Sequence, residues 1–195
     1  MKLISLLEKL EYTCLQGSTD QEVKNVIYDS RKVEEGSLFI CIRGAVVDGH
    51  KFVPDVVAKG AKVLIVEEAV EAPEDVTVIL VKNTRYAMAF ISAAYFGYPA
   101  EKLKTIGITG TKGKTTTTYM VKSILENAGY KVGLIGTIEA IIGDKVIPAK
   151  NTTPESYVIQ EYFHEMAEAG CDCVVMEVSS QGLMLHRTQG FVFDF

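Results

Sequence analysis

The sequence predicts an α/β protein: a small mixed α/β domain is followed by the first part of a doubly wound parallel sheet with a phosphate-binding loop. Three observations support this fold class. Apolar runs of strand length alternate with helical patterns along the 195 residues. A glycine-rich turn at residues 107–116 joins one such run to a helix. Residues 171–178 are almost continuously apolar, as expected of a parallel strand covered on both faces.

The first domain, residues 1–101, is predicted to consist of short elements. We expect helices at 3–10, 51–59 and 84–96, and strands at 23–28, 37–42, 62–66 and 76–81. Pro54 fits the first turn of the second helix, where its missing N–H costs nothing. Gly97 and Pro99 end the third helix, because neither residue readily continues one. We therefore place the domain boundary after residue 101.

The second domain, residues 102–195, restarts with its own strand and helix. We expect strands at 104–109, 131–136 and 171–178, helices at 115–128 and 155–169, and a hairpin of 138–142 with 145–147. Gly129 and Gly170 follow the two helices, where glycine commonly forms the C-terminal cap. Residues 191–195 have the pattern of a strand that has barely begun, so we expect a longer native protein.

The composition is that of an ordinary globular protein, with 48% hydrophobic and 23% charged residues. The net charge of −5 argues against a nucleic-acid partner. The apolar run near the N-terminus is too short for a signal peptide, and no stretch approaches the ~20 apolar residues of a membrane span. We expect a cytoplasmic monomer without a membrane partner. Cys171 and Cys173 alternate along a strand-like run, so we expect both to point to one buried face. We favour this over metal binding, because no histidine or further cysteine completes a metal spacing.

The glycine-rich turn has the residues needed to hold a polyphosphate. Backbone N–H groups in such a turn and at the following helix N-terminus are fixed partial positive charges. Lys114 adds a full charge, and Thr115 supplies a hydroxyl of the kind that holds Mg²⁺. The strict motif has glycine where this chain has Ile108. The predicted phosphate-binding residues are Gly110, Thr111, Lys112, Gly113, Lys114, Thr115 and Thr116.

Glu177 is the second candidate, because it ends an apolar strand and ligands bind at the carboxyl ends of such strands. Mg²⁺ needs hard oxygen ligands, and Thr115 and Glu177 can supply two. We favour this role over a solvated acid. The residue types alone favour turn chemistry at 151–153. They leave Arg187 open between a bound phosphate and a surface ion pair.

Several stretches form a set that is characteristic of one enzyme family. They are residues 29–33, 36–39, 48–52, 109–118, 151–154, 176–183 and 186–187. Together they resemble the Mur ligases of bacterial cell-wall synthesis over essentially the whole chain. The Asn-Thr-Thr loop at 151–153 with Glu-Val-Ser-Ser at 177–180 points to members that add the third amino acid of the peptide stem. The Asp-Ser-Arg segment at 29–31 is shared with members that add the terminal D-Ala-D-Ala.

The resemblance implies ATP-dependent amide bond formation, with ATP and Mg²⁺ as cofactors. The carboxylate of a UDP-linked muramoyl dipeptide attacks the γ-phosphate of ATP, and the resulting acyl phosphate reacts with the amine of a free amino acid. Lys114 and Glu177 are the implied catalytic residues, and Thr115 and Glu177 are the implied metal ligands. The amino acid itself, whether meso-diaminopimelate, lysine or another, stays open.

The resemblance also implies the substrate-binding residues. On the N-terminal domain, uracil and ribose would contact Tyr28, Ser30, Ala45, Val46 and Val47. The diphosphate, sugar and peptide would contact Asn151, Thr152, Thr153, Ser179 and Arg187. The family's carbamylated lysine and amino-acid-binding domain do not lie within residues 1–195, so we expect the chain to be inactive alone. The alternatives are the ligase that adds D-Ala-D-Ala to a UDP-linked tripeptide and a non-catalytic nucleotide-binding module.

Overall fold

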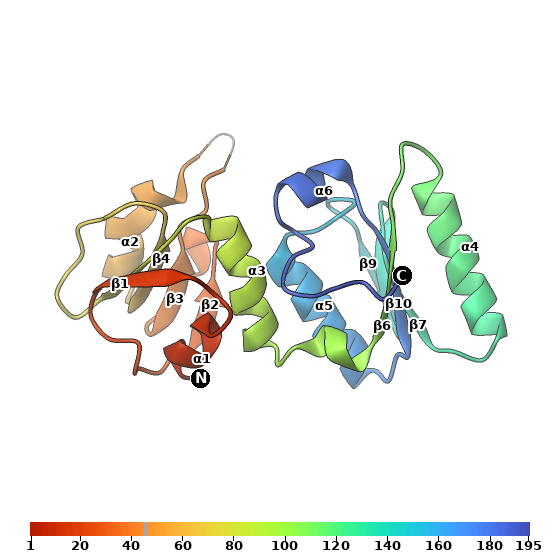
Figure 1. Cartoon of the computed structure of the whole chain (residues 1–195), viewed down its shortest axis with the longest axis horizontal. Helices are drawn as coiled ribbons and strands as arrows, with labels where there is room; N and C mark the ends of the chain where they lie inside the picture. Colours follow the sequence, from red (N-terminus) through yellow and green to blue (C-terminus); the bar gives the residue numbers. More distant parts are fainter. Residues whose placement is uncertain (45–46) are drawn as a thin grey trace. The chain divides into compact units, whose positions relative to one another are not determined.

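The protein is described by a computed structural model that covers residues 1–44 and 47–195 (Figure 1). The chain forms two compact units, residues 1–95 and 96–195. Each unit is built on a five-stranded sheet, and the predicted α/β class is confirmed. The division falls earlier than the predicted boundary after residue 101, and the assignment of the two domains stays a prediction. Within the described residues, no helix is both long and apolar enough to cross a membrane.

The first unit contains a largely parallel sheet. Its strands are β1 Tyr12–Gln16, β2 Asn25–Ile27, β3 Ser37–Ile40, β4 Val63–Val66 and β5 Thr77–Val81. Its helices are α1 Leu3–Leu7, α2 Val53–Ala58 and α3 Thr84–Tyr95, with 3-10 turns η1 Ser30–Lys32 and η2 Gly49–Phe52. The strand order is β1-β5-β4-β3-β2. Strands β2 to β5 run parallel, and β1 pairs antiparallel with β5.

Burial explains which of these elements the sequence predicts. Every residue of β3 and β4 is buried, as expected for parallel strands covered on both faces. All four predicted strands and all three predicted helices are present, although α1 ends at Leu7 rather than at residue 10. Strand β1 was not predicted. It is an edge strand with four of its five residues exposed, so it lacks the apolar alternation that marks a half-buried strand.

The second unit combines a parallel sheet with a hairpin. Its strands are β6 Lys104–Ile108, β7 Val132–Ile135, β8 Glu139–Ile142, β9 Lys145–Pro148 and β10 Cys173–Glu177. Its helices are α4 Lys114–Asn127, α5 Ser156–Glu168 and α6 Ser180–Met184, with the 3-10 turn η3 Pro99–Lys102. The strand order is β6-β10-β7-β8-β9. Strands β6, β10 and β7 are parallel, and the predicted hairpin of β8 and β9 is confirmed.

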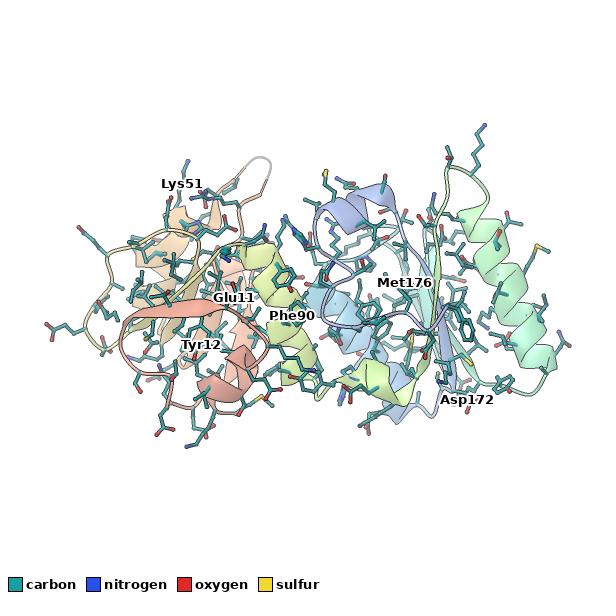
Figure 2. The ribbon with its side chains drawn as sticks, in the orientation of Figure 1. Glu11, Tyr12, Lys51, Phe90, Asp172 and Met176 are labelled. Carbon is teal, nitrogen blue, oxygen red and sulfur yellow. The ribbon has the colours of Figure 1, made fainter. Side chains whose placement is uncertain are left out.

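Helices α4 and α5 cover opposite faces of the second sheet (Figure 1). Met176 of β10 belongs to a core cluster with residues of α5 (Figure 2). Val175 lies in a separate cluster that includes residues of α4. Cys171 and Cys173 are both buried, but they belong to these different clusters, so the prediction of one shared face is wrong. Cys171 precedes β10, and the strand alternation does not extend to it.

The C-terminal residues lie along the edge of β6 that faces away from β10. The backbone N–H of Asp194 donates to the carbonyl of Thr105 at 2.9 Å, and that of Gly107 donates to the carbonyl of Phe195 at 2.9 Å. The predicted strand at 191–195 is not formed. Instead, Asp194 and Phe195 make backbone hydrogen bonds with Thr105 and Gly107 of β6.

Candidate functional site

The turn between β6 and α4 is shaped by two glycines. Gly110 has φ 152° and Gly113 has φ 80°, a backbone region that side-chain-bearing residues rarely adopt. Apart from Gly113 itself and its two neighbours in the chain, no described residue has an atom within 4 Å of the position that a Cβ on Gly113 would occupy. Thr111 and Lys112 are exposed. The N-terminus of the 14-residue helix α4 therefore opens onto an accessible loop, which is the arrangement that binds phosphate groups.

Lys114 begins α4 and closes this loop on itself. Its Nζ donates a hydrogen bond of 2.9 Å to the carbonyl of Gly110. The ammonium group is thus held at the loop, where a polyphosphate could replace the carbonyl as its partner. Thr116 is exposed in the first turn of the same helix. The predicted phosphate-binding residues are contiguous in space, and their contact with ATP stays a prediction.

Glu177 is wholly buried at the end of β10 and accepts hydrogen bonds from two threonines. The Thr115 hydroxyl donates to Oε2 at 3.0 Å, although the two residues are 62 positions apart. The Thr137 N–H donates to Oε1 at 2.9 Å, and its hydroxyl donates to Oε2 at 3.0 Å. The structure therefore brings together Thr115 and Glu177, the two predicted metal ligands.

The geometry of this pair fits Mg²⁺. The two oxygen atoms are 3.0 Å apart. Octahedral Mg²⁺ with bonds of 2.0–2.1 Å holds neighbouring ligand atoms about 2.9 Å apart. Both atoms are hard oxygens, which this ion prefers. To bind the metal, the Thr115 hydroxyl has only to turn its hydrogen away from Glu177. Metal binding by these residues stays a prediction that the geometry permits.

Thr137 is the site residue that sequence reasoning missed. It follows Gly136 directly after β7, so it lies at the carboxyl end of a parallel strand. A Cβ on Gly136 would lie 2.7 Å from Oε1 of Glu177, so only glycine allows the carboxylate to approach the backbone here. The signal that could have identified Thr137 is the Gly-Thr pair at the end of an apolar strand.

The Asn-Thr-Thr loop lies beside the same carboxylate residue. Thr153 is buried, and its hydroxyl donates to the carbonyl of Glu177 and accepts from the N–H of Ser179, both at 2.9 Å. The Thr152 and Thr137 hydroxyl oxygens are 3.0 Å apart. Asn151 is exposed. Substrate contacts of the loop stay predictions, and the Thr153 hydroxyl already has two partners within the protein.

Arg187 and Ser179 support the segment that follows β10. The guanidinium of Arg187 donates to the carbonyl of Thr153 at 2.9 Å and pairs with Glu155 at 2.7 Å. Only 11% of the Arg187 side chain and 21% of the Glu155 side chain are exposed. The Ser179 hydroxyl caps α6 by accepting from the N–H of Gly182 at 3.0 Å. Of the two possibilities left open for Arg187, the structure contains an ion pair, but it is largely buried rather than on the surface.

The residues predicted to bind uridine follow β2 and β3 in the first unit. Tyr28 and Ser30 are half-buried, and the Ser30 carbonyl accepts from Nζ of Lys59 at 2.7 Å. Val47 is exposed, whereas Ala45 and Val46 lie outside the described residues. These substrate contacts stay predictions.

Asp29 lies between Tyr28 and Ser30 and stabilises the turn that follows β2. It accepts hydrogen bonds from the side chain and the backbone N–H of Arg31. The Arg31 side chain is the main cause that lowers the pKa of Asp29 to about 2. Asp29 therefore stabilises this turn through local hydrogen bonds.

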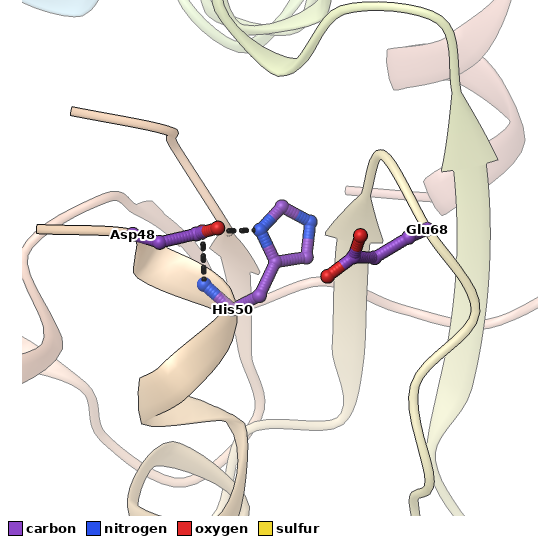
Figure 3. A group of neighbouring side chains, drawn as sticks. All are labelled: Asp48, His50 and Glu68. Carbon is purple, nitrogen blue, oxygen red and sulfur yellow. Dashed lines mark hydrogen bonds and ion pairs between the residues drawn. The ribbon is translucent and has the colours of Figure 1, made fainter. Parts of the chain in front are cut away.

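Asp48, His50 and Glu68 form a group with metal-ligand chemistry in the same unit (Figure 3). Both ring nitrogens of His50 already have partners, however. Nδ1 lies 2.6 Å from Oδ1 of Asp48, and Nε2 accepts from the N–H of Glu67 at 2.9 Å. Glu68 pairs with Arg43. Because no ring lone pair of His50 is available, this group is structural rather than a metal site.

Both halves of the chain match the same family. Residues 22–96 match the "Mur ligase family, catalytic domain", and residues 108–195 match the "Mur ligase middle domain". The UDP-N-acetylmuramoyl-L-alanyl-D-glutamate–2,6-diaminopimelate ligase of Clostridium perfringens is 52% identical over 194 residues, which cover 100% of this chain and 40% of that protein. The chain thus spans about 40% of the length of the curated relatives it matches.

Solved structures show the same fold. A structure of UDP-N-acetylmuramoyl-L-alanyl-D-glutamate–2,6-diaminopimelate ligase aligns with a TM-score of 0.79 and 22% identity, over 98% of this chain and 38% of that one. The UDP-N-acetylmuramoylalanyl-D-glutamyl-2,6-diaminopimelate–D-alanyl-D-alanyl ligase of Acinetobacter baumannii aligns with a TM-score of 0.62 and 26% identity, over 92% of this chain and 36% of that one. The first alignment is closer in fold, although its sequence identity is lower.

Proposed function

Because this chain belongs to the Mur ligase family, we propose that it supplies the UDP-substrate-binding domain and the first part of the ATP-binding domain of a peptidoglycan ligase. The reaction adds the third amino acid to UDP-N-acetylmuramoyl-L-Ala-D-Glu. The observation that carries this proposal is the convergence on Glu177 of the phosphate loop, through Thr115, and of the Asn-Thr-Thr loop, through Thr153. The proposed nucleotide site and the proposed substrate site thereby adjoin one residue, since Thr115 contacts the Glu177 carboxylate and Thr153 contacts its backbone carbonyl.

In the proposed reaction, the chain's residues mainly position and neutralise charge. The loop amides and Lys114 bind the phosphates of ATP while the substrate carboxylate attacks the γ-phosphorus and ADP leaves. The amine of the amino acid then attacks the acyl phosphate carbon, phosphate leaves, and the nitrogen loses a proton as the amide forms. Thr115 and Glu177 would hold Mg²⁺, which supplies positive charge at the phosphate oxygens.

The names of the relatives bear on the choice of amino acid. Those that match this chain at 44–52% identity are named as 2,6-diaminopimelate ligases. We therefore propose 2,6-diaminopimelate as the third amino acid and the UDP-linked dipeptide as its acceptor. The proposed setting is the cytoplasm, with a monomeric chain that binds neither nucleic acid nor membrane. The net charge of −5 supports the absence of a nucleic-acid partner.

Calorimetric titration of this chain tests the proposal. We expect it to bind a non-hydrolysable ATP analogue with Mg²⁺ and, separately, the UDP-linked dipeptide. Lys114→Ala should weaken nucleotide binding at least tenfold, or about 1.4 kcal/mol, because the charge at the loop is lost. Lys102→Ala is the matched control, since Lys102 is an exposed lysine of η3 outside the loop. Unchanged nucleotide binding by Lys114→Ala would contradict the assigned role. Preference for the UDP-linked tripeptide would favour the D-Ala-D-Ala ligase.

A further inference from the structure

Thr137 has no predicted role, but it forms several hydrogen-bond contacts within the proposed site. Its N–H and hydroxyl bind the two different oxygens of the Glu177 carboxylate, at 2.9 and 3.0 Å. Its hydroxyl oxygen also lies 3.0 Å from that of Thr152. Thr137 is thus in contact with both the candidate metal ligand and the Asn-Thr-Thr loop.

Only one arrangement of the hydroxyl hydrogens satisfies the donors and acceptors of Thr152, Thr137 and Glu177. A backbone N–H can only donate, and a carboxylate can only accept. The single hydroxyl hydrogen of Thr137 therefore goes to Oε2 of Glu177, and its lone pair accepts the hydroxyl hydrogen of Thr152. The result is a directed chain from Thr152 through Thr137 to Glu177.

The turn that carries Thr137 is held by a hydrogen bond within the turn and by another from helix α4. The N–H of Gly136 donates to the carbonyl of Glu139 at 3.0 Å. The Tyr119 hydroxyl, from α4, donates to Oε1 of Glu139 at 2.8 Å. Burial and this hydrogen bond raise the pKa of Tyr119 to about 12, so it remains a donor at neutral pH. Helix α4, which also carries Thr115, therefore holds the turn in place.

Metal binding would leave Thr137 as the main support of the carboxylate. If Thr115 gives its hydroxyl oxygen to Mg²⁺, its hydrogen bond to Glu177 is lost, and the two bonds from Thr137 remain. We propose that Thr137 is a positioning residue that orients Glu177 for the metal–nucleotide complex and links this carboxylate to Thr152. This inference rests on the proposed function, and it adds a physical connection between the nucleotide site and the substrate loop.

Paired variants of Thr137 test the first half of the proposal. Thr137→Val keeps the shape and the N–H but removes the hydroxyl, whereas Thr137→Ser keeps the hydroxyl. We expect Thr137→Val to weaken Mg²⁺-dependent binding of the ATP analogue about tenfold, since a hydrogen bond to a charged group is lost. Thr137→Ser should stay within about threefold of wild type. Binding in EDTA should change little in either variant, whereas the melting temperature should fall in Thr137→Val more than in Thr137→Ser, because the same hydrogen bond is present without the metal.

The outcomes separate this inference from the proposed function. A wild-type chain that binds no Mg²⁺-nucleotide overturns the proposed function and this inference together. Wild-type binding with an unchanged Thr137→Val overturns this inference alone. An equal loss with Mg²⁺ and in EDTA also overturns it, because the residue would then support the fold rather than the metal ligand.

A double-mutant cycle tests the link to Thr152. We expect Thr152→Val alone to weaken Mg²⁺-dependent nucleotide binding about threefold, and Thr152→Val added to Thr137→Val to have no further effect. If the two effects are additive, or if Thr152→Val alone has none, the link between the nucleotide site and the substrate loop is absent.

Discussion

Both units have polar side chains at the carboxyl ends of their parallel strands. The carboxylates of Asp29 and Asp48 in the first unit, however, have different kinds of partner from the carboxylate of Glu177 in the second. In the first unit, Asp29 pairs with Arg31 and Asp48 bonds to His50. In the second unit, the hydrogen bonds to the Glu177 carboxylate come from the neutral N–H and hydroxyl groups of Thr115 and Thr137. Asp29 and Asp48 are thus held by an arginine and a histidine, whereas Glu177 is held by two hydroxyls and one backbone N–H.

The difference determines which carboxylate can take a new ligand. A cationic or fixed N–H partner cannot reverse its role, so it holds the carboxylate permanently. At Asp48, burial pushes the pKa upward, but the interactions with His50 and the nearby charge of Arg43 together lower it below its ordinary value. A hydroxyl can rotate and become an acceptor or a metal ligand. Oε2 of Glu177, whose donors are the hydroxyls of Thr115 and Thr137, is therefore the oxygen suited to exchange partners for Mg²⁺.

Substitution of Glu177 should have the largest effect on stability. Glu177→Ala leaves a cavity and the Thr137 N–H without a partner, so we expect the free energy of unfolding of the second unit to fall by about 3 kcal/mol. Glu177→Gln should cost less than about 1 kcal/mol, because rotated hydroxyls can accept from the new amide. Native-state hydrogen exchange of β6 and β10 measures both, with β3 and β4 as the internal control. If Gln destabilises as much as Ala, the proposed contrast between the units is wrong.

Removal of His50 should have a smaller effect, confined to the first unit. His50→Ala leaves Asp48 and the N–H of Glu67 without the partners described above, at a cost of about 2 kcal/mol. Slower-exchanging amides of β3 and β4 should lose protection, whereas those of β10 should not. Lys51→Ala, at an adjacent exposed position, is the control. Equal loss in both units, or none in the first, would contradict the view that this group is a local structural network.

Local patterns explain why most of the fold was predictable. Strands such as β4 and β10 are buried along their whole length, and an uninterrupted apolar run records this directly. The turn before α4 needs glycine at positive φ, so the sequence marks it as well. Strand β1 has no such apolar pattern, since most of its residues face solvent.

The site was only partly predictable, because strand order creates it. Strand β10 comes last along the chain but lies between β6 and β7. In this register Glu177 pairs with Ile108 of β6, and Met176 with Ile135 of β7. That order alone places the carboxylate between the phosphate loop and Thr137. The Gly-Thr pair after β7 has residue types that are ordinary in turns. It becomes informative only once β10 is known to lie beside β7.

The smallest expected effect concerns Asp29, whose partner is charged but exposed. Its pKa lies at about 2, below its ordinary 3.8, so its contribution to stability is present above pH 3.8 and is lost as the pH falls through 2. Arg31→Gln removes the guanidinium but keeps the backbone N–H bond. We expect the pKa of Asp29 to rise only part of the way to 3.8, and the stability change at neutral pH to stay below about 1 kcal/mol. Carboxyl NMR titration measures the shift, with Lys32→Gln as the neighbouring charge control. An unchanged pKa would show that the backbone N–H of Arg31 alone keeps the pKa of Asp29 low. A charged partner would then not be what distinguishes Asp29 from Glu177.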